Sequence, residues 1–205
     1  MVIRFDHLTY VCSNTELEYT LSKFTSIGYR EAFREESIPN IPPKKTLLKH
    51  PNEKHCLFFL EKDNSIPIEV ISYELTTHSP QMIEFASEGC SFTYNTRDVE
   101  SLKLLFESIG FKRIDELTYN AKGVLDKNDS IIKIRETMNP SALLDNEGFT
   151  CPTFFIDSYI KTKAKVEENG FTCTESYPIV INGRDLNIFF AIGKANEIIE
   201  LISNK

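Results

Sequence analysis

The stretch HLTYVCSNTELEYTLSKFTSIGY, residues 7–29, recurs in outline as CSFTYNTRDVESLKLLFESIGF at 90–111 and as CPTFFIDSYIKTKAKVEENGF at 151–171. Each copy begins with an apolar, aromatic run that predicts a strand, and a pattern with helical spacing follows it. A polar break separates the two parts and contains a residue of a type that caps helices, namely Asn14, Asp98 or Asp157. A strand–helix unit is therefore present three times, and this repetition decides the fold.

Each helical pattern ends at a glycine, which is Gly28, Gly110 or Gly170. Because glycine takes the left-handed conformation easily, it can close a helix. Three further β segments follow in each copy: 29–34, within 45–61 and 66–74 in the first; 112–119, around 123–126 and 130–136 in the second; 172–181, 185–192 and 196–203 in the third. These strands are too closely spaced for a doubly wound parallel sheet. We therefore predict an α+β fold of repeated βαβββ modules, with a mixed or antiparallel sheet and helices on one face.

The three modules are predicted at residues 1–75, 88–137 and 151–205, and the second is compressed. Residues 75–89 are predicted to form a linker with some helical character. Residues 37–44 contain three prolines and predict an irregular loop that is stiff enough to cover one end of a pocket. We expect the modules to pair into one or two compact domains.

The composition excludes several classes of protein. The chain has 205 residues, of which 41% are hydrophobic, so a sizeable core is available. The formal net charge of −7 argues against a nucleic-acid partner, which would require clustered Lys and Arg. No apolar tract of about 18 residues is present to span a bilayer. Five cysteines without a CxxC pair suggest neither a disulfide framework nor a zinc knuckle. We expect a cytoplasmic, reduced protein without a membrane partner.

Two predicted strands each contain one glutamate among aliphatic residues: Glu69 in IPIEVISYE and Glu200 in NEIIELISNK. His7 likewise shares a strand face with apolar neighbours such as Phe5 and Val11. A carboxylate on an apolar face needs a partner, because an unpaired buried charge costs several kcal/mol. A metal ion, an arginine or an exposed strand edge would each provide one. Imidazole together with carboxylates suits Zn²⁺, Fe²⁺, Mn²⁺ or Ni²⁺.

A repeated βαβββ unit with a histidine on its first strand and a glutamate on its last resembles the vicinal-oxygen-chelate superfamily. This superfamily includes glyoxalase I, extradiol dioxygenases, methylmalonyl-CoA epimerase, and the bleomycin and fosfomycin resistance proteins. The resemblance lies in FDHLTYV (5–11), SIGY (26–29) and IEVIS (68–72), with SIGF and IIELIS as echoes. It implies paired modules that form a cupped sheet, with a divalent metal in the cup.

The resemblance also implies roles for particular residues. His7, Glu69 and Glu200 would be the metal ligands, and Glu69 would also serve as the general base. The metal would bind two neighbouring oxygens of a small organic substrate, in a lyase, isomerase, epimerase or dioxygenase reaction. Because strand aromatics can line a pocket, we expect His55, Phe59 and Tyr73 to contact the substrate.

The sequence departs from the pattern of this superfamily in its second and third copies. When the copies are aligned, Gly89 occupies the position of His7 and Lys133 the position of Glu200. The second copy therefore has neither ligand. The first strand of the third copy offers Cys151 or Thr153 in place of a histidine. Three modules are also an unusual number. One module either embellishes the other two or pairs across a homodimer, and we expect a homodimer.

Other interpretations of these residues remain open. His7 can be a hydrogen-bonded core histidine, Glu69 the polar floor of a metal-free pocket, and Glu200 an exposed residue near the chain end. Besides the metal-dependent enzyme, the alternative function is therefore metal-free binding or sequestration of a small molecule, as in the resistance proteins. A weaker third option is a scaffold that assembles through its sheets. Whether the protein is an enzyme is left open.

Overall fold

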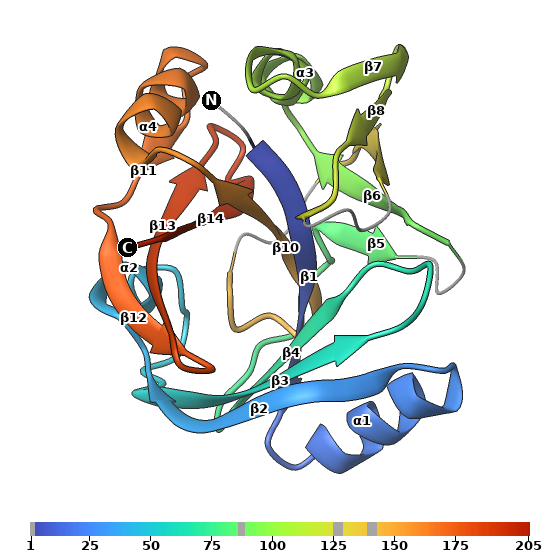
Figure 1. Cartoon of the computed structure of the whole chain (residues 1–205), viewed down its shortest axis with the longest axis vertical. Coiled ribbons are helices and arrows are strands. Elements are labelled where there is room, and N and C mark those ends of the chain that lie inside the picture. The colour runs from blue at the N-terminus through green and yellow to red at the C-terminus, as the bar shows by residue number, and fades with distance from the viewer. Residues whose placement is uncertain (1–2, 86–88, 125–128, 139–142) are drawn as a thin grey trace.

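The computed structural model describes residues 3–85, 89–124, 129–138 and 143–205 (Figure 1). The first module contains four strands and two helices: β1 (Ile3–Ser13), α1 (Leu17–Ser26), β2 (Arg30–Pro39), α2 (Pro42–Lys45), β3 (Lys54–Glu61) and β4 (Ile68–Tyr73). The second region contains β5 (Ile83–Phe85), β6 (Ser91–Thr96), α3 (Val99–Ser108), β7 (Lys112–Asp115), β8 (Thr118–Ala121) and β9 (Ser130–Glu136). The third contains β10 (Gly148–Ile156), α4 (Tyr159–Glu168), β11 (Thr172–Cys173), β12 (Tyr177–Ile181), β13 (Arg184–Ile192) and β14 (Ile198–Asn204).

The first and third modules share one nine-stranded sheet. Its order is β11-β13-β14-β10-β1-β4-β3-β2, and β12 pairs with β13. The two modules meet where β1 runs antiparallel to β10, from Ile3 opposite Ile156 to Val11 opposite Gly148. On either side of this seam the next pairing is parallel, β1 with β4 and β10 with β14. The second module forms a separate five-stranded sheet, β5-β6-β9-β8-β7.

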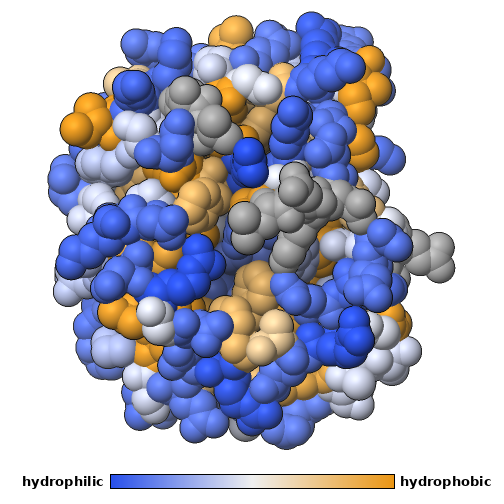
Figure 2. Space-filling view, in the orientation of Figure 1, coloured by the Kyte–Doolittle hydropathy of each residue, from blue (hydrophilic) through white to orange (hydrophobic). Residues whose placement is uncertain are grey.

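Figure 1 shows the large sheet curling around a central space, with α1 and α4 on its outside. The sheets are mixed, and strands outnumber helices. The predicted α+β fold of βαβββ units with a curved mixed sheet is therefore confirmed. In the described ranges, no helix has the length and the apolar run needed to cross a bilayer. Most of the face in Figure 2 is hydrophilic, with small apolar groups between the polar side chains.

Helix ends follow the repeated sequence pattern more closely than helix starts do. Gly28, Gly110 and Gly170 have φ values of 95°, 91° and 82°, so each takes the left-handed conformation expected after a helix. Of the three expected caps, Asp98 does cap its helix, since its carboxylate accepts the Ser101 N–H at 3.0 Å. The N-caps of the other two helices are Glu16 and Ser158, without a side-chain hydrogen bond, so Asn14 and Asp157 were wrongly assigned.

Four segments differ from the sequence expectations. Residues 37–44 do not form an irregular loop, because β2 continues through Pro39 and the two prolines at 42–43 start α2. The strand expected over 112–119 is a hairpin, β7 and β8, whose turn places the Leu117 N–H 3.0 Å from the Asp115 carboxylate. In the segment around 123–126, Gly123 makes only an isolated bridge with Phe5, and residues 125 and 126 lie outside the described ranges. The linker 75–89 contains the short strand β5, and its described residues, 75–85 and 89, form no helix.

The main core lies between the large sheet and the second module. Phe5 of β1 is central to it, with its ring centroid 5.4 Å from that of Phe92 and 5.7 Å from that of Phe154. Two polar contacts tie β6 to the start of β14 and the residue before it. The Tyr94 hydroxyl donates to the Ile198 carbonyl at 2.9 Å, and the Thr96 hydroxyl donates to the buried Glu197 carboxylate.

Leu8 lies at the seam on β1 and is fully buried in the main core. Because Leu8→Ala would leave a cavity there, we expect it to lower the free energy of unfolding by about 2–5 kcal/mol, measured by urea denaturation. Ile160→Ala on the outside of α4, where the side chain is 78% exposed, is the control and should change that free energy by about 0.5 kcal/mol or less. Equal effects of the two substitutions would contradict this placement of the core.

Candidate metal centre

Three strands bring His7, Glu69 and Glu200 together on the inner face of the large sheet. His7 lies on β1, Glu69 on the neighbouring β4 and Glu200 on β14, beyond β10. The register explains their proximity. Glu69 stands beside Thr9 of β1, Glu200 beside Thr153 of β10, and Thr153 is itself opposite His7. The two carboxylates therefore approach the imidazole from opposite sides.

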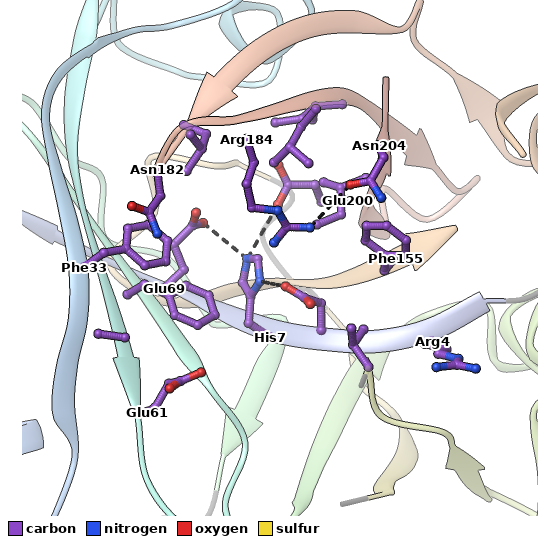
Figure 3. A pocket seen from close by; sticks show the side chains of 18 of the residues that line it. Arg4, His7, Phe33, Glu61, Glu69, Phe155, Asn182, Arg184, Glu200 and Asn204 are labelled. Atoms are coloured by element: carbon purple, nitrogen blue, oxygen red, sulfur yellow. Dashed lines mark hydrogen bonds and ion pairs between the residues drawn. The ribbon is translucent and has the colours of Figure 1, made fainter. Parts of the chain in front are cut away.

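The carboxylates of Glu69 and Glu200 both point toward His7 Nε2 (Figure 3). This atom lies 3.5 Å from Oε2 of Glu69 and 4.0 Å from Oε2 of Glu200. One ligand atom from each residue lies within 4.8 Å of the others. His7 is 5% exposed, and its Nε2 is buried without a hydrogen-bond partner. Its contacts with the two carboxylates are longer than a hydrogen bond, and a metal ion placed between them would give this buried nitrogen a direct partner.

Asp6 fixes the orientation of the His7 ring. Its carboxylate lies 2.7 Å from His7 Nδ1, which leaves Nε2 directed at the two glutamates. A carboxylate behind a ligating histidine is the usual outer-shell arrangement of metal sites. Sequence reasoning missed Asp6, because strand alternation places neighbouring residues on opposite faces. The ladder between β1 and β10 is irregular between Phe5 and His7, and at that point the alternation is interrupted.

Each glutamate is also held by a threonine of its own module. The Thr9 hydroxyl donates to Glu69 Oε2 at 3.1 Å, and the Thr153 hydroxyl donates to Glu200 Oε2 at 2.7 Å. Alignment of HLTY (7–10) with CPTF (151–154) in the repeats places these two threonines at the same position. That match is the sequence signal that could have identified them. The same alignment places Cys151 at the position of His7. Cys151 is buried, and burial raises the pKa of its thiol, so it remains protonated.

The charges of the cluster are strongly interdependent. Burial disfavours the imidazolium, but the charge of Glu69 and the hydrogen bond to Asp6 outweigh it and raise the pKa of His7 to about 10. Burial likewise disfavours the Glu69 carboxylate, but His7 outweighs this effect and lowers the pKa of Glu69. Burial and the charge of Glu69 raise the pKa of Glu200. A metal ion would therefore have to displace a proton from His7, as metal binding to histidine generally does.

The cluster lies at a cavity of about 670 Å³. The cavity is lined by apolar side chains and by about as many polar or charged ones, among them Arg184, Asn182 and Asn204. Its apolar lining includes Phe33, Phe59, Phe155, Ile181, Leu186, Ile188 and Ile202. The rings of Phe33 and Phe59 stack at 5.1 Å, and the Phe59 ring also meets the edge of His7 at 5.3 Å. This volume and lining suit a small organic molecule.

The structure places the three expected substrate-contacting residues differently. Phe59 lines the large cavity. His55 lies behind the carboxylates, at a smaller cavity of about 40 Å³ that it shares with Lys44, Glu69 and Glu200. Tyr73 is fully buried, and its ring lies 5.8 Å from that of His55. His55 and Tyr73 therefore lie outside the large cavity.

The donor set fits a divalent metal. One imidazole and two carboxylates are suitable ligands for Zn²⁺, Fe²⁺, Mn²⁺ or Ni²⁺, and the orphaned Nε2 of His7 is aimed at the point where the ligand atoms meet. Within the described ranges, His7, Glu69 and Glu200 form the cluster that can hold such an ion. In the second module, the corresponding Lys133 is exposed on β9.

The chain is similar over nearly its whole length to a crystallised single-substitution mutant of glyoxalase I from Zea mays. The TM-score is 0.62 at 12% sequence identity, with 98% of this chain and 94% of that chain covered. The chain has the vicinal-oxygen-chelate fold. A methylmalonyl-CoA epimerase from Streptomyces coelicolor also matches, with a TM-score of 0.46, 11% identity, and 100% and 99% of the two chains covered. The sequence matches no protein-family model and no curated protein at a significant level.

His55 makes the stability of the protein depend on pH. Burial and the charge of Lys44 hold the pKa of His55 well below its usual 6.5. Below pH 6.5 the unfolded chain binds a proton at this residue that the folded chain does not, so the free energy of unfolding falls as the pH falls. We expect His55→Asn to weaken this fall, measured by urea denaturation of both proteins from neutral to acidic pH. The difference between the two proteins should be constant above neutral pH, and parallel curves throughout would contradict the assignment.

Proposed function

We propose that this protein is a metal-dependent enzyme that acts on a small oxygenated organic substrate. The observation that carries the proposal is the convergence of His7, Glu69 and Glu200, with a buried Nε2 that makes no hydrogen bond, at a cavity lined in part by apolar side chains. Lyase, isomerase, epimerase and dioxygenase reactions fit such a site. The ligands come from a single chain, so the proposal does not require the homodimer that the sequence led us to expect.

The residues have distinct proposed roles. His7, Glu69 and Glu200 would hold the ion, which would act as a Lewis acid on two neighbouring oxygens of the substrate. Asp6 orients His7, and Thr9 and Thr153 fix the two carboxylates by hydrogen bonds. Glu69 is the proposed proton acceptor. The apolar wall of the cavity excludes water around the substrate, which strengthens the electrostatic interactions of the site.

Metal-free binding of a small molecule is the second candidate function. The stacked Phe33 and Phe59 rings give the cavity an aromatic wall suited to an apolar ligand. The thiol of Cys151, at the position where a second histidine would complete a four-ligand site, also supports it. A thermal-shift screen of metabolites and antibiotics on metal-stripped protein would detect such binding.

Metal analysis of untagged protein tests the first candidate. We expect about one divalent ion per chain, since three donors and a satisfied outer shell are present. His7→Ala should abolish stoichiometric binding, because it removes the central donor. His78→Ala, at an exposed histidine outside the cluster, should retain the ion. Protein that binds no divalent ion, or His7→Ala protein that retains its full metal content, would contradict the proposal.

Glu69→Gln tests the proposed proton acceptor. An amide cannot accept the proton, so we expect exchange of hydrogen for deuterium in a panel of α-hydroxy ketones to fall by about 100-fold or more, even with excess metal. The exchange is measured by NMR in D₂O. Glu200→Gln is the matched comparison, because it removes the symmetry-related carboxylate, and excess metal should restore most of its activity. Full exchange by metal-loaded Glu69→Gln would assign the proton acceptor elsewhere.

A further inference from the structure

A buried lysine lies behind the two carboxylates of the cluster. Lys44 is 8% exposed, although lysine is almost never buried without a charged partner. It lines the two smaller cavities together with Glu69 and Glu200, whereas the large cavity is lined by these carboxylates without Lys44. The two glutamates thus lie between the large cavity and the two smaller ones, and Lys44 lines only the smaller ones.

Local structure directs Lys44 inward. Proline occupies the first positions of α2, where its fixed φ suits the start of a helix. Ile41 and Leu47, on either side of Lys44 in sequence, are both buried in a small apolar cluster that includes Phe190. The next residue, Lys45, instead pairs with Glu53 at the surface. Of these two adjacent lysines, only Lys44 points toward the site.

The surroundings of the Lys44 ammonium contain two negative charges. Its Nζ lies 3.5 Å from His55 Nε2 and 5.7 Å from the centroid of the Tyr73 ring. His55 is neutral, and burial raises the pKa values of the Tyr73 hydroxyl and the Cys151 thiol, which therefore keep their protons. Burial also lowers the pKa of Lys44, and the charges of Glu69 and Glu200 oppose that shift. An unpaired buried ammonium costs several kcal/mol, and the charges of the two carboxylates favour the ammonium from beyond the distance of a direct ion pair.

We propose that Lys44 is a positioning residue that acts as an internal counter-ion of the two carboxylates of the cluster. Its positive charge weakens the binding of the divalent ion and makes the loaded site prefer an anionic ligand. This inference rests on the proposed function, because it presumes an ion held by His7, Glu69 and Glu200. Two carboxylates balance one divalent ion, so the ammonium leaves a surplus positive charge. Asp6, which is hydrogen-bonded to His7 and 23% exposed, adds a negative charge that offsets part of this surplus.

The surplus charge defines the class of substrate. A ligand that binds the ion through two neighbouring oxygens, and either carries one negative charge or acquires it as an oxyanion during the reaction, would restore neutrality in the buried site. Such a ligand would be favoured over a neutral chelator of the same shape, because charge interactions are strong where water is excluded.

Lys44→Met and Lys45→Met form a matched pair for the test. Methionine removes the charge at similar volume, but loss of one member of a group of buried charges is destabilising, so the fold of each variant is first checked by its thermal melting curve. Mn²⁺ and Zn²⁺ affinities are measured by competition with a chromophoric chelator at neutral pH. We expect Lys44→Met to bind each ion about tenfold more tightly than the wild type, since the ammonium no longer repels it. The exposed Lys45→Met should stay within about twofold of the wild type.

Acetohydroxamate, a chelator that binds as a monoanion through two neighbouring oxygens, is the ligand probe. Metal-loaded Lys44→Met should bind it about tenfold more weakly than the metal-loaded wild type. Lys44→Arg keeps the charge and should return both affinities toward the wild-type values. Lys44→Gln replaces Lys44→Met if the latter does not fold, as judged by its thermal melting curve.

The outcomes separate the two proposals. Folded Lys44→Met with unchanged affinities for the ion and for acetohydroxamate would overturn the counter-ion role and leave the metal-dependent enzyme intact. Wild-type protein that binds neither Mn²⁺ nor Zn²⁺ would overturn the proposed function and this inference with it. If Lys44 had a purely structural role, Lys44→Met would alter the melting temperature. It would not change the affinity for the ion and the affinity for acetohydroxamate in opposite directions.

Discussion

The antiparallel pairing of β1 with β10 is the interaction on which the rest of the structure depends. It joins the first and third modules into one sheet and places β4 and β14 on its two sides. Each module taken alone contributes only part of the donor set: His7 and Glu69 from the first, and Glu200 from the third. The cluster therefore exists only because the backbone hydrogen bonds of one strand pair hold two modules in a single register.

Much of this arrangement follows from the sequence, and the exceptions have physical reasons. The repeats predicted the βαβββ unit, and the resemblance to a known superfamily directed attention to His7, Glu69 and Glu200, which the structure brings together. The hydrogen bond from Asp6 could not be predicted, because it depends on an irregularity in the β1 ladder. Lys44 was missed because prolines indicate where a chain turns and not where the next side chain points.

The pairing of the modules was also beyond sequence reasoning. All three copies carry the same pattern of apolar residues, and that pattern specifies which face of a strand is buried without specifying which strand lies next to it. The hairpin β7–β8 shows the same limitation on a smaller scale. An uninterrupted β-like run at 112–119 contains a turn that is stabilised by the Asp115 carboxylate.

The two halves of the large sheet are symmetric in their hydrogen bonds and asymmetric in their chemistry. A threonine anchors a glutamate in each half, yet the position equivalent to His7 in the other half holds the thiol of Cys151. Each half therefore contributes a carboxylate to the cluster, whereas the imidazole comes from one half alone.

The contacts of Tyr94 and Thr96 with Ile198 and Glu197 have a mechanical consequence. These contacts hold the chain two and three residues before Glu200, so the second module fixes the strand that carries this candidate ligand, although its own described residues add none to the cluster. Substitutions that break the contacts of Tyr94 and Thr96 would therefore leave the Glu200 carboxylate less firmly positioned, although no residue of the cluster itself had changed.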